Sequence, residues 1–327
     1  MIQQLIIFNW KHWIVFISIL SILNNSCQSS KKEEKSVKIP DEKKIFFDDF
    51  NYKTLEDFYE NNWKIRNQKG HPGIKNATWS KEGISFHSDI ETTNKGIIRM
   101  TSSTSGTGET THQTQLCHQR KYLEGTYASR VYFRDSPTSG PDGDEVIQTF
   151  YAISPLKAPM DPDYSEADFE YLPNGGWGEG SEPNFWSTTW ETFQLEPWTK
   201  VNEYSFNKAS YQGWHTLVLT IKNEKVSYYI DGKLLGEHGE NVYPEVPMSI
   251  NFNLWFVANS ASVDKATLDS EEERIYQEDI DWVFHQVGEV LTTVQVQEMV
   301  ENFRNQNIQY LDKVPQMNPP LESPCGL

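Results

Sequence analysis

From Ile45 onward, apolar and polar residues alternate in short runs that predict β-strands. The runs are rich in β-branched and aromatic residues, and clusters of Gly, Pro, Asn or Ser separate them. In the most regular stretch, WHTLVLTIKNEKVSYYIDGKLLGEHG, the pair Asp231-Gly232 suits the positive φ of a tight hairpin turn. Many short strands without alternating helices predict an all-β fold, a sandwich or jelly roll. The other predicted strands lie in IFFDDF, GISFHS, GIIRMTSS, TYASRVYF, EVIQTFYAIS, EADFEYL, PMSINFNLWFVA and EDIDWVFHQV.

Two stretches depart from this pattern. Residues 263–279 are acidic, and we expect a loop with a helical turn there. Residues 292–314 carry apolar side chains close to helical spacing, which predicts a C-terminal helix. We expect the Pro-rich residues that follow to be extended. The apolar residues of the predicted helix are Val296, Met299, Val300, Phe303 and Ile308.

The N-terminal segment has the pattern of an export signal. Lys11 precedes the apolar run 13–23, which is too short to span a bilayer comfortably. Ser26-Cys27 then resembles the processing site of bacterial lipoproteins, in which the Cys receives lipid. We therefore expect residues 1–27 to be a signal peptide with lipidation at Cys27, and ordinary secretion or a retained anchor as alternatives. In each case the protein is exported.

The rest of the chain divides into three parts. Residues 28–44 are polar and mixed in charge, a composition that cannot form a core and predicts a flexible tether. Residues 45–288 hold the predicted strands, and residues 289–327 hold the helix and the Pro-rich tail. Besides the predicted lipidation site, the only cysteines are Cys117 and Cys325. They either pair in an oxidising compartment or stay as a buried thiol and a thiol in the tail.

Composition narrows the classes of partner. The net charge of −17 and the pI of about 4.9 disfavour phosphate groups, and therefore nucleic acid, as a partner. Nine of the eleven Trp lie beyond the N-terminal segment. Trp beside carboxylates suits carbohydrate recognition, because the C–H face of a sugar stacks on the ring while its hydroxyls meet polar groups. Any single Trp is also explained by a place in the core.

Three acids, Glu166, Asp168 and Glu170, alternate with apolar residues along EADFEYL. On a strand, this spacing places the acids on one face and the apolar residues on the other. Like charges so close raise one another's pKa and destabilise the strand. The acids therefore form either a solvated face or a site. Trp177 and the glycines of LPNGGWG follow at the strand's end, where a ligand-shaping loop is expected.

A row of three acids suits the hydrolysis of a glycosidic bond with retention of the anomeric configuration. This reaction needs a carboxylate nucleophile and a protonated carboxyl about 5–5.5 Å apart. The α-carbons of Glu166 and Glu170 are separated by four steps of about 3.3 Å on a straight strand. A concave curve and two long side chains that lean inward would close this gap. Asp168 between them would share a proton with its neighbour and tune the pKa of the nucleophile.

At this point the sequence resembles a known family. EADFE resembles the Glu-x-Asp-x-Glu signature of glycoside hydrolase family 16, whose members use a concanavalin A-like jelly roll of two antiparallel sheets with a concave cleft. Four further motifs occur in the family's order between Phe46 and Gln286. They are YLEGTYASRVYF (with Gly125, Tyr127 and Arg130), GWHTLVLTIKNEKVSYYIDGK (with His215 and Asp231-Gly232), SINFNLWF (with Asn253 and Trp255) and IDWVFHQ.

The resemblance implies roles for these residues. Glu166 is expected to be the nucleophile, Asp168 its assisting residue and Glu170 the general acid/base. Asp281 matches a residue that binds a structural calcium ion in some members, although it could equally cap a turn, and the reaction requires no cofactor. Tyr164 stands where the family usually has Trp, so that the aromatic platform is smaller. The expected substrate-binding residues are Arg130, Tyr164, Trp177, Trp186, Asn253 and Trp255.

The resemblance implies a retaining endo-glycoside hydrolase that cleaves a β-linked polysaccharide of β-glucan or galactan type. The short form of the motif favours β-1,3-1,4- or β-1,4-glucans, and the negative charge of the chain would repel a sulfated galactan unless a local basic patch intervened. The alternatives are a lectin-like binding protein on the same fold, a transglycosylase, and a structural or adhesion protein. We expect a monomer that contacts the membrane only through its lipid.

Overall fold

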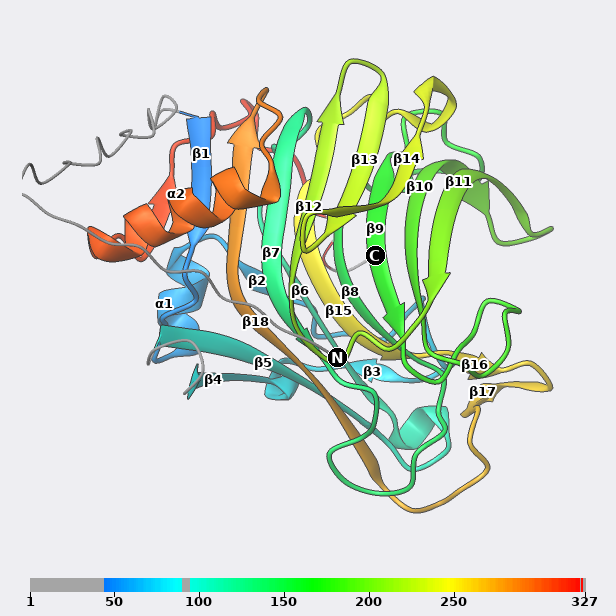
Figure 1. The fold of residues 1–327 in the computed structure, drawn as a ribbon. Helices are drawn as coiled ribbons and strands as arrows, with labels where there is room; N and C mark the ends of the chain where they lie inside the picture. The colour runs from blue at the N-terminus through cyan, green and yellow to red at the C-terminus, as the bar shows by residue number, and fades with distance from the viewer. Residues whose placement is uncertain (1–43, 90–94, 324, 326–327) are drawn as a thin grey trace, which may run out of the picture. The chain divides into compact units, whose positions relative to one another are not determined.

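The computed structural model describes residues 44–89, 95–323 and 325 of the 327-residue chain. These residues form two β-sheets packed face to face, with a helix against one of them, as Figure 1 shows. The predicted signal peptide, its lipidation site Cys27 and the tether before residue 44 lie outside the described residues. Within the described ranges, no helix is long and apolar enough to cross a membrane.

The sheet that carries the three acids is called here the front sheet. Its strands are antiparallel and follow the order β11-β10-β9-β8-β15-β6-β2. The strand β9 therefore lies between β8 and β10, and Figure 1 shows these strands curving. The strands are β2 (Lys64–Ile65), β6 (His112–Cys117), β8 (Val146–Ile153), β9 (Glu166–Leu172), β10 (Asn184–Gln194), β11 (Thr199–Lys208) and β15 (Ser249–Phe256).

The back sheet runs in the order β14-β13-β12-β7-β18. Beyond β18, the N-terminal half of that strand pairs with β5, which carries β4, and the C-terminal half pairs with β1, which carries β19. The strands are β1 (Ile45–Asp48), β4 (Ile84–Asp89), β5 (Lys95–Thr104), β7 (Gly125–Phe133), β12 (Gly213–Lys222), β13 (Lys225–Ile230), β14 (Lys233–His238), β18 (Arg274–Val287) and β19 (Tyr310–Asp312).

Shorter elements complete the fold. The strand β3 runs parallel to β6, and β16 pairs with β17 in a separate hairpin. The predicted turn at Asp231-Gly232 joins β13 to β14, and both residues have positive φ. The bounds are β3 (Thr78–Trp79), β16 (Ala258–Asn259), β17 (Ser262–Ala266), α1 (Leu55–Glu60), α2 (Thr293–Asn305) and the 3₁₀ turns Lys81–Gly83, Gly108–Thr110 and Glu240–Val242.

The core between the sheets follows from the period of two along each strand. Phe150 of β8, Phe169 of β9 and Phe252 of β15 are buried and stack, with ring centroids 6.2 Å apart for the first pair and 5.1 Å apart for Phe150 and Phe252. Tyr228 of β13 packs edge-on against Phe169 from the opposite sheet. Because these residues point inward, their neighbours point to the face of the front sheet that is turned away from the core. This second face is called here the open face.

The predicted C-terminal helix is α2, and it packs on the outer face of the back sheet. Thr292 and Gln295 form a capping box at its start, which satisfies backbone N–H groups that have no partner within the helix. Val296, Val300 and Phe303 then contact a cluster that includes Phe47 and Trp282. The chain continues into β19, and Cys325 forms a disulfide with Cys117 of β6. The two thiols therefore pair, which is one of the two alternatives open from the sequence.

Two features of the fold differ from the sequence predictions. Residues 263–279 contain no helical turn: they form β17, a loop and the start of β18. Residues 184–208 form the long pair β10 and β11, which the strand pattern did not indicate. The strand β11 lies at the edge of the front sheet and its side chains are mostly exposed or half-buried. It therefore lacks the alternation of apolar and polar residues by which half-buried strands are recognised.

Candidate active site

The three acids lie side by side on the open face of the front sheet. The residues between them, Ala167 and Phe169, are fully buried in the core, so Glu166, Asp168 and Glu170 point the other way. The row is enclosed on both sides because β9 pairs with β8 and β10 along the whole stretch. The structure therefore brings the three predicted acids together on one face, and it buries them partly instead of leaving them on a solvated surface.

Glu166 occupies a half-buried position with hydrogen-bond donors beside it. The hydroxyl of Tyr164 donates to its Oε2. Burial raises the pKa of Glu166, while hydrogen bonds from Tyr164 and Asp168 act in the opposite direction by favouring the charged carboxylate. Of the three acids, Glu166 is thus the one whose ionised form is best supported by hydrogen bonds.

Asp168 is held in one orientation from the neighbouring strand. The indole Nε1 of Trp190 donates to its Oδ2 at 2.9 Å, and its Oδ1 is buried without a conventional donor among the described residues. Burial, followed by the charges of Glu166 and Glu170, raises the pKa of Asp168 well above its usual range. Burial and the two neighbouring charges thus favour the protonated form of the Asp168 carboxyl. A proton on Oδ1 can be donated in a hydrogen bond to Glu166. This bond gives Oδ1 the partner that it otherwise lacks.

Glu170 has the surroundings of a carboxyl that keeps its proton. Burial raises its pKa, and the negative charge of Glu166 raises it further. A hydrogen bond from Trp177 and the positive charge of Lys200 act in the opposite direction. Lys200 reaches this place from β11, where its ammonium lies 5.5 Å from the ring centroid of Trp190. The row therefore holds two carboxyls in different environments, which is how one site keeps an acid and a base at the same pH.

Aromatic side chains flank the acids on the open face. Trp186 lies opposite Glu170 on β10 and stacks on Phe206 of β11 with ring centroids 4.6 Å apart. Trp177 is 41% exposed and its ring lies 5.9 Å from that of Trp255. The predicted residues Trp177, Trp186 and Trp255 are therefore all close to the acid row. Trp177 adopts φ of 54°, because the glycine-rich loop after β9 turns sharply there.

Sequence reasoning missed the aromatic residues of the β10–β11 pair. Trp190 lies four residues after Trp186, and this spacing on a strand predicts a shared face once the strand is known. No comparable signal marks β11, where Tyr204 and Phe206 lie two residues apart in a mostly polar stretch. The exposed aromatic residues of β11 and of the turn before it are Trp198, Tyr204 and Phe206.

A polar network lies on the other side of the row. Thr149 Oγ1 donates to Oδ1 of Asn253 at 2.7 Å, and Nδ2 of Asn253 donates to the hydroxyl of Tyr151 at 3.1 Å. Gln115 Nε2 also donates to this hydroxyl, at 2.9 Å. Tyr151 pairs with Asp168 across β8 and β9. Because its oxygen accepts two hydrogen bonds, the Tyr151 O–H is free to donate beside the acids. Asn253 thus lies near the acid row, and Tyr151 was not predicted.

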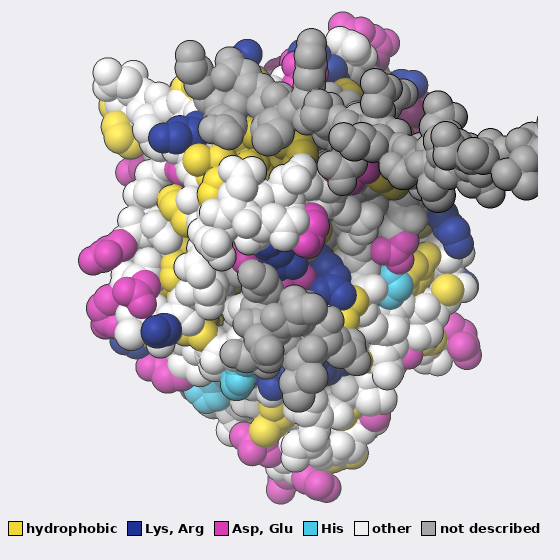
Figure 2. Space-filling view, turned by 60° about the vertical axis from the view of Figure 1, so that its left-hand side comes forward, with side chains coloured by type: hydrophobic (Ala, Val, Ile, Leu, Met, Phe, Trp, Pro, Cys, Tyr) yellow, Lys and Arg dark blue, Asp and Glu magenta, His cyan; other side chains and the backbone are white. Residues whose placement is uncertain are grey.

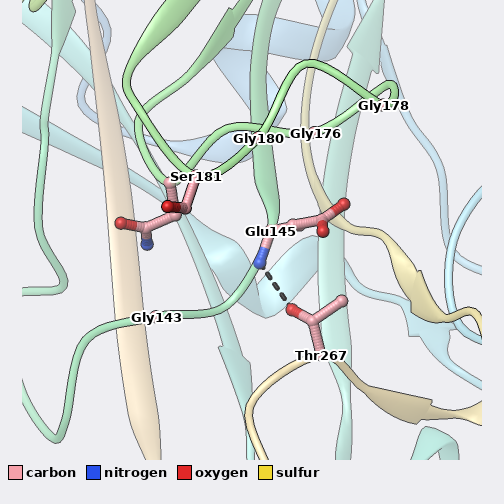
Figure 3. Close-up of a pocket in the computed structure, with 8 residues that line it drawn as sticks. Gly143, Glu145, Gly176, Gly178, Gly180, Ser181 and Thr267 are labelled. Atoms are coloured by element: carbon pink, nitrogen blue, oxygen red, sulfur yellow. Dashed lines mark hydrogen bonds between the residues drawn. The ribbon is translucent and has the colours of Figure 1, made fainter.

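A pocket of about 430 Å³ lies beside the loop that carries Trp177 and contains none of the three acids. It is lined by the glycines on both sides of Trp177 and by Glu145, whose backbone N–H donates to Thr267 Oγ1 at 2.6 Å. Figure 3 shows Glu145 next to this glycine-rich loop. Burial raises the pKa of Glu145. The pocket therefore places one more carboxyl beside the loop that carries Trp177.

Two predicted site residues lie elsewhere. Arg130 was expected to line the cleft, but on β7 it points to the outer face of the back sheet, where it stacks on Trp214 and donates to Asp281 at 2.7 Å. The prediction is wrong because Val131 and Phe133 occupy the core face of that strand, so that Arg130 must point outward.

Asp281 does not have the surroundings of a calcium ligand. It is fully buried, and its two oxygens accept from Arg130 and from Arg304 of α2. Arg304 also pairs with Asp49. Two guanidinium groups repel a cation, and calcium needs six to eight oxygen ligands. Among the described residues, no group of three or more acids, His or Cys could hold a metal ion. The residues therefore do not fit the structural calcium that the resemblance implied.

Tyr164 is close to the row but cannot serve as a stacking platform. It is only 3% exposed, and its ring packs edge-on against Phe193. The expectation of a sugar-stacking residue is therefore wrong here, and Tyr164 acts on Glu166 through its hydroxyl. On the face that Figure 2 shows, acidic side chains are scattered, with Lys and Arg in small groups among them.

Comparison of sequences leaves the chain without a match: no protein-family model fits it, and no curated protein is similar to it. Comparison of structures does find similar proteins. A family 16 glycoside hydrolase of Bacteroides ovatus, solved with a mixed-linkage glucan product, has a TM-score of 0.56 at 16% identity, with 73% of this chain and 98% of that chain covered.

Two further solved structures show the same likeness. The laminarinase of a Flavobacterium species has a TM-score of 0.54 at 16% identity and covers 74% of this chain and 99% of its own. The κ-carrageenase of Pseudoalteromonas carrageenovora, solved with an oligosaccharide of κ-carrageenan, has a TM-score of 0.52 at 14% identity, with 78% and 99% covered. The described sandwich therefore has the jelly-roll fold of family 16 glycoside hydrolases.

Proposed function

We propose that the protein is a retaining endo-glycoside hydrolase that cleaves a β-linked polysaccharide. The observation that carries the proposal is the row of three carboxyls on β9, one buried and two half-buried, in unequal surroundings. Hydrogen bonds favour the ionised form of Glu166, and the charge of Glu166 favours the protonated form of Glu170. These are the states that a nucleophile and a general acid need. The shared jelly-roll fold and the aromatic residues beside the row support the same function.

In the first step, a carboxylate oxygen of Glu166 attacks the anomeric carbon. Glu170 gives its proton to the glycosidic oxygen while the bond between that oxygen and the anomeric carbon breaks. One part of the polysaccharide leaves with the proton, and the other part is held as an ester on Glu166. Asp168, oriented by Trp190, donates a hydrogen bond to Glu166 and is a positioning residue in this step.

In the second step, water attacks the anomeric carbon from the side that the leaving group occupied. Glu170 accepts a proton from the water, and Glu166 leaves as a carboxylate. The two inversions produce net retention, and the side chains of the row supply every proton transfer. Capture of the ester by a sugar hydroxyl in place of water would make the protein a transglycosylase.

The open face suits an extended chain of sugars. Trp177 presents an exposed apolar ring near the acids, backed by the nearly buried rings of Trp186 and Trp255, and Asn253 and Tyr151 add hydrogen-bonding groups. A binding surface that extends beyond the acid row is typical of an enzyme that cuts within a chain. The substrates named for the similar structures, mixed-linkage glucan and κ-carrageenan, are both polysaccharides, which agrees with a β-glucan or galactan type of substrate.

The test measures reducing ends released from mixed-linkage glucan, laminarin, xyloglucan, agarose and carrageenan by the purified protein. The variants Glu166→Gln and Glu170→Gln are measured beside the wild type. Release by the wild type and a loss of at least about 10³-fold in both variants would support the proposal. Proton NMR of the first product would then show the β-anomer if the configuration is retained.

Azide distinguishes the two carboxyl roles. In Glu166→Ala the space left by the nucleophile lies on the α face of the sugar, so azide should yield an α-glycosyl azide from an activated substrate. In Glu170→Ala it should yield the β-glycosyl azide, because the glycosyl ester still forms on Glu166. If one glycan binds the wild type and both Gln variants equally and none is cleaved, the row is not catalytic and the lectin-like alternative is favoured.

We also propose that the protein is exported as a lipoprotein, with its lipid on Cys27. The support is the apolar run 13–23 followed by Ser26-Cys27 and a polar stretch. Radiolabelled palmitate should be incorporated into the wild type and lost in Cys27→Ser. Equal labelling of both proteins, or of neither, would contradict lipidation at this residue.

A further inference from the structure

Arg66 lies on the same face of the front sheet as the three acids. Its backbone N–H donates to the carbonyl of Gln115 at 3.0 Å, directly after the short pairing of β2 with β6. Ile65, its neighbour, packs against the core, so Arg66 points to the open face. Gln115 pairs with Asn253 of β15, and Asn253 pairs with Thr149 of β8. The pairing of Thr149 with Glu170 completes a cross-strand row of residues from Arg66 to the acids.

The guanidinium of Arg66 is buried without a counter-charge. The residue is 3% exposed, it stacks on Trp79 with 4.5 Å from Cζ to the ring centroid, and Nη1 donates to Oε1 of Gln115 at 3.2 Å. No carboxylate of the described residues pairs with it, and Nε and Nη2 are buried without a hydrogen-bond partner. A buried cation with two unpaired donors is costly unless an anion joins it.

The two unpaired donors form the edge of the guanidinium that binds oxyanions side-on. The same edge binds carboxylates elsewhere in this chain. In Arg274, Nε and Nη2 both donate to Asp144, at 2.9 and 3.1 Å, and in Arg99 the same two atoms donate to Asp279, at 2.7 and 2.9 Å. Arg66 thus presents a fork of the right geometry, and the described part of the protein provides no oxyanion for it.

Gln115 fixes this fork relative to the acid row. Its Oε1 accepts from Arg66 and its Nε2 donates to Tyr151, which also accepts from Asn253. The stack on Trp79 holds the plane of the guanidinium from the other side. A group bound by Arg66 is therefore held at a defined place along the same surface on which the sugars would lie.

We propose that Arg66, held by Gln115 and Trp79, binds an anionic substituent of the polysaccharide, either a sulfate ester or a sugar carboxylate. This inference rests on the proposed function and specifies its substrate class. The overall charge of −17 disfavours such a substrate at long range. At contact, the side-on fork favours an oxyanion, because a charge-assisted bidentate pair is about twice as strong as neutral hydrogen bonds.

The test measures binding to full-length protein that carries Glu166→Gln, so that no oligosaccharide is cleaved. Titration calorimetry uses three probes: a neutral mixed-linkage glucan oligosaccharide, a sulfated κ-carrageenan oligosaccharide and a uronate-containing β-glycan oligosaccharide. Addition of Arg66→Met should weaken binding of one anionic probe by about tenfold or more and leave the neutral probe unchanged. Arg66→Lys, which keeps the charge and loses the fork, should recover only part of the affinity.

The control is Lys225→Met, which removes a charge at an exposed pair on β13 of the back sheet and should change none of the affinities. Arg66→Met should also be at least as stable as the wild type, since it removes an unpaired buried charge. A loss of stability together with weaker binding of all three probes would overturn the inference and indicate a structural role. The inference is also overturned if Arg66→Met leaves the affinity for both anionic probes unchanged, or if neither anionic probe binds.

The Arg66 inference and the proposed hydrolase function can fail independently of each other. If the wild type cleaves only neutral glucans and Arg66→Met alters neither kcat nor KM, the inference fails while the proposed function stands. If an anionic probe binds through Arg66 and no glycan is cleaved, the anion site stands and the hydrolase does not. The two anionic probes distinguish sulfate from carboxylate.

Discussion

The indole Nε1 of Trp190 donates a hydrogen bond to Oδ2 of Asp168 at 2.9 Å, across the pairing of β10 with β9. This bond turns the other oxygen, Oδ1, into a buried position without a conventional donor among the described residues. A protonated Asp168 is the state that satisfies both oxygens. The orientation of the middle acid is thus set by a side chain from another strand, and this acid in turn orients Glu166.

Trp190→Phe should therefore slow catalysis without affecting the fold. The aromatic volume is nearly kept, and a hydrogen bond worth about 1 kcal/mol is lost, so kcat should fall about fivefold. Circular dichroism and the melting temperature provide the control for folding. A purely structural role for Trp190 would instead raise KM and lower stability, with kcat unchanged.

Activity should depend on pH as a bell with both limbs above the usual range of carboxyl groups. The acid limb reports ionisation of Glu166, whose pKa is raised to about 7, and the basic limb reports deprotonation of Glu170, whose pKa is raised to about 8. Burial is the main cause for both. The profile of kcat/KM should peak at neutral to weakly alkaline pH, and Glu170→Gln should abolish the basic limb on an activated substrate. An optimum near the usual carboxyl range, about pH 4–5, would contradict this.

The stability of the fold should decrease as pH rises. Glu170 titrates near 4.5 when exposed and near 8 in the folded protein, so its contribution to the free energy of unfolding is fully present below pH 4.5 and is lost as pH rises through about 8. Each such group adds a slope of about 1.4 kcal/mol per pH unit in this window. Urea unfolding across this window, from about pH 4.5 to about pH 8.5, should show a shallower decline for Glu170→Gln than for the wild type. Parallel curves would contradict the raised pKa.

Arg304 should contribute to stability in the place where the resemblance implied calcium. It links α2 to Asp49 and Asp281, which are buried acids. Arg304→Met removes one cationic partner from each of these charges and should lower the free energy of unfolding by about 3 kcal/mol. Addition of calcium or of a chelator should leave the melting temperature of the wild type unchanged. A calcium-dependent rise in that temperature would show that a cation competes with the two arginines.

Much of the fold is predictable from local pattern. The period of two in EADFEYL is enough to place Glu166, Asp168 and Glu170 on one face, because a strand allows no other arrangement of alternate side chains. The same reasoning finds the hairpin at Asp231-Gly232, and the spacing of Val296 and Val300 finds α2. These properties depend on neighbours within a few residues, so the sequence alone determined them.

Tertiary structure decided which other side chains share the open face with the three acids. Trp190 comes from β10, which pairs with β9, and Lys200 comes from β11, which pairs with β10. Arg66 reaches the same face from the end of β2, at the opposite edge of the front sheet. Arg130 stands in a motif that resembles one of family 16, but it points to the outer face because Val131 and Phe133 occupy the core face of β7. A strand pattern specifies that two faces exist, and only packing of the two sheets selects which face becomes core and which face stays open.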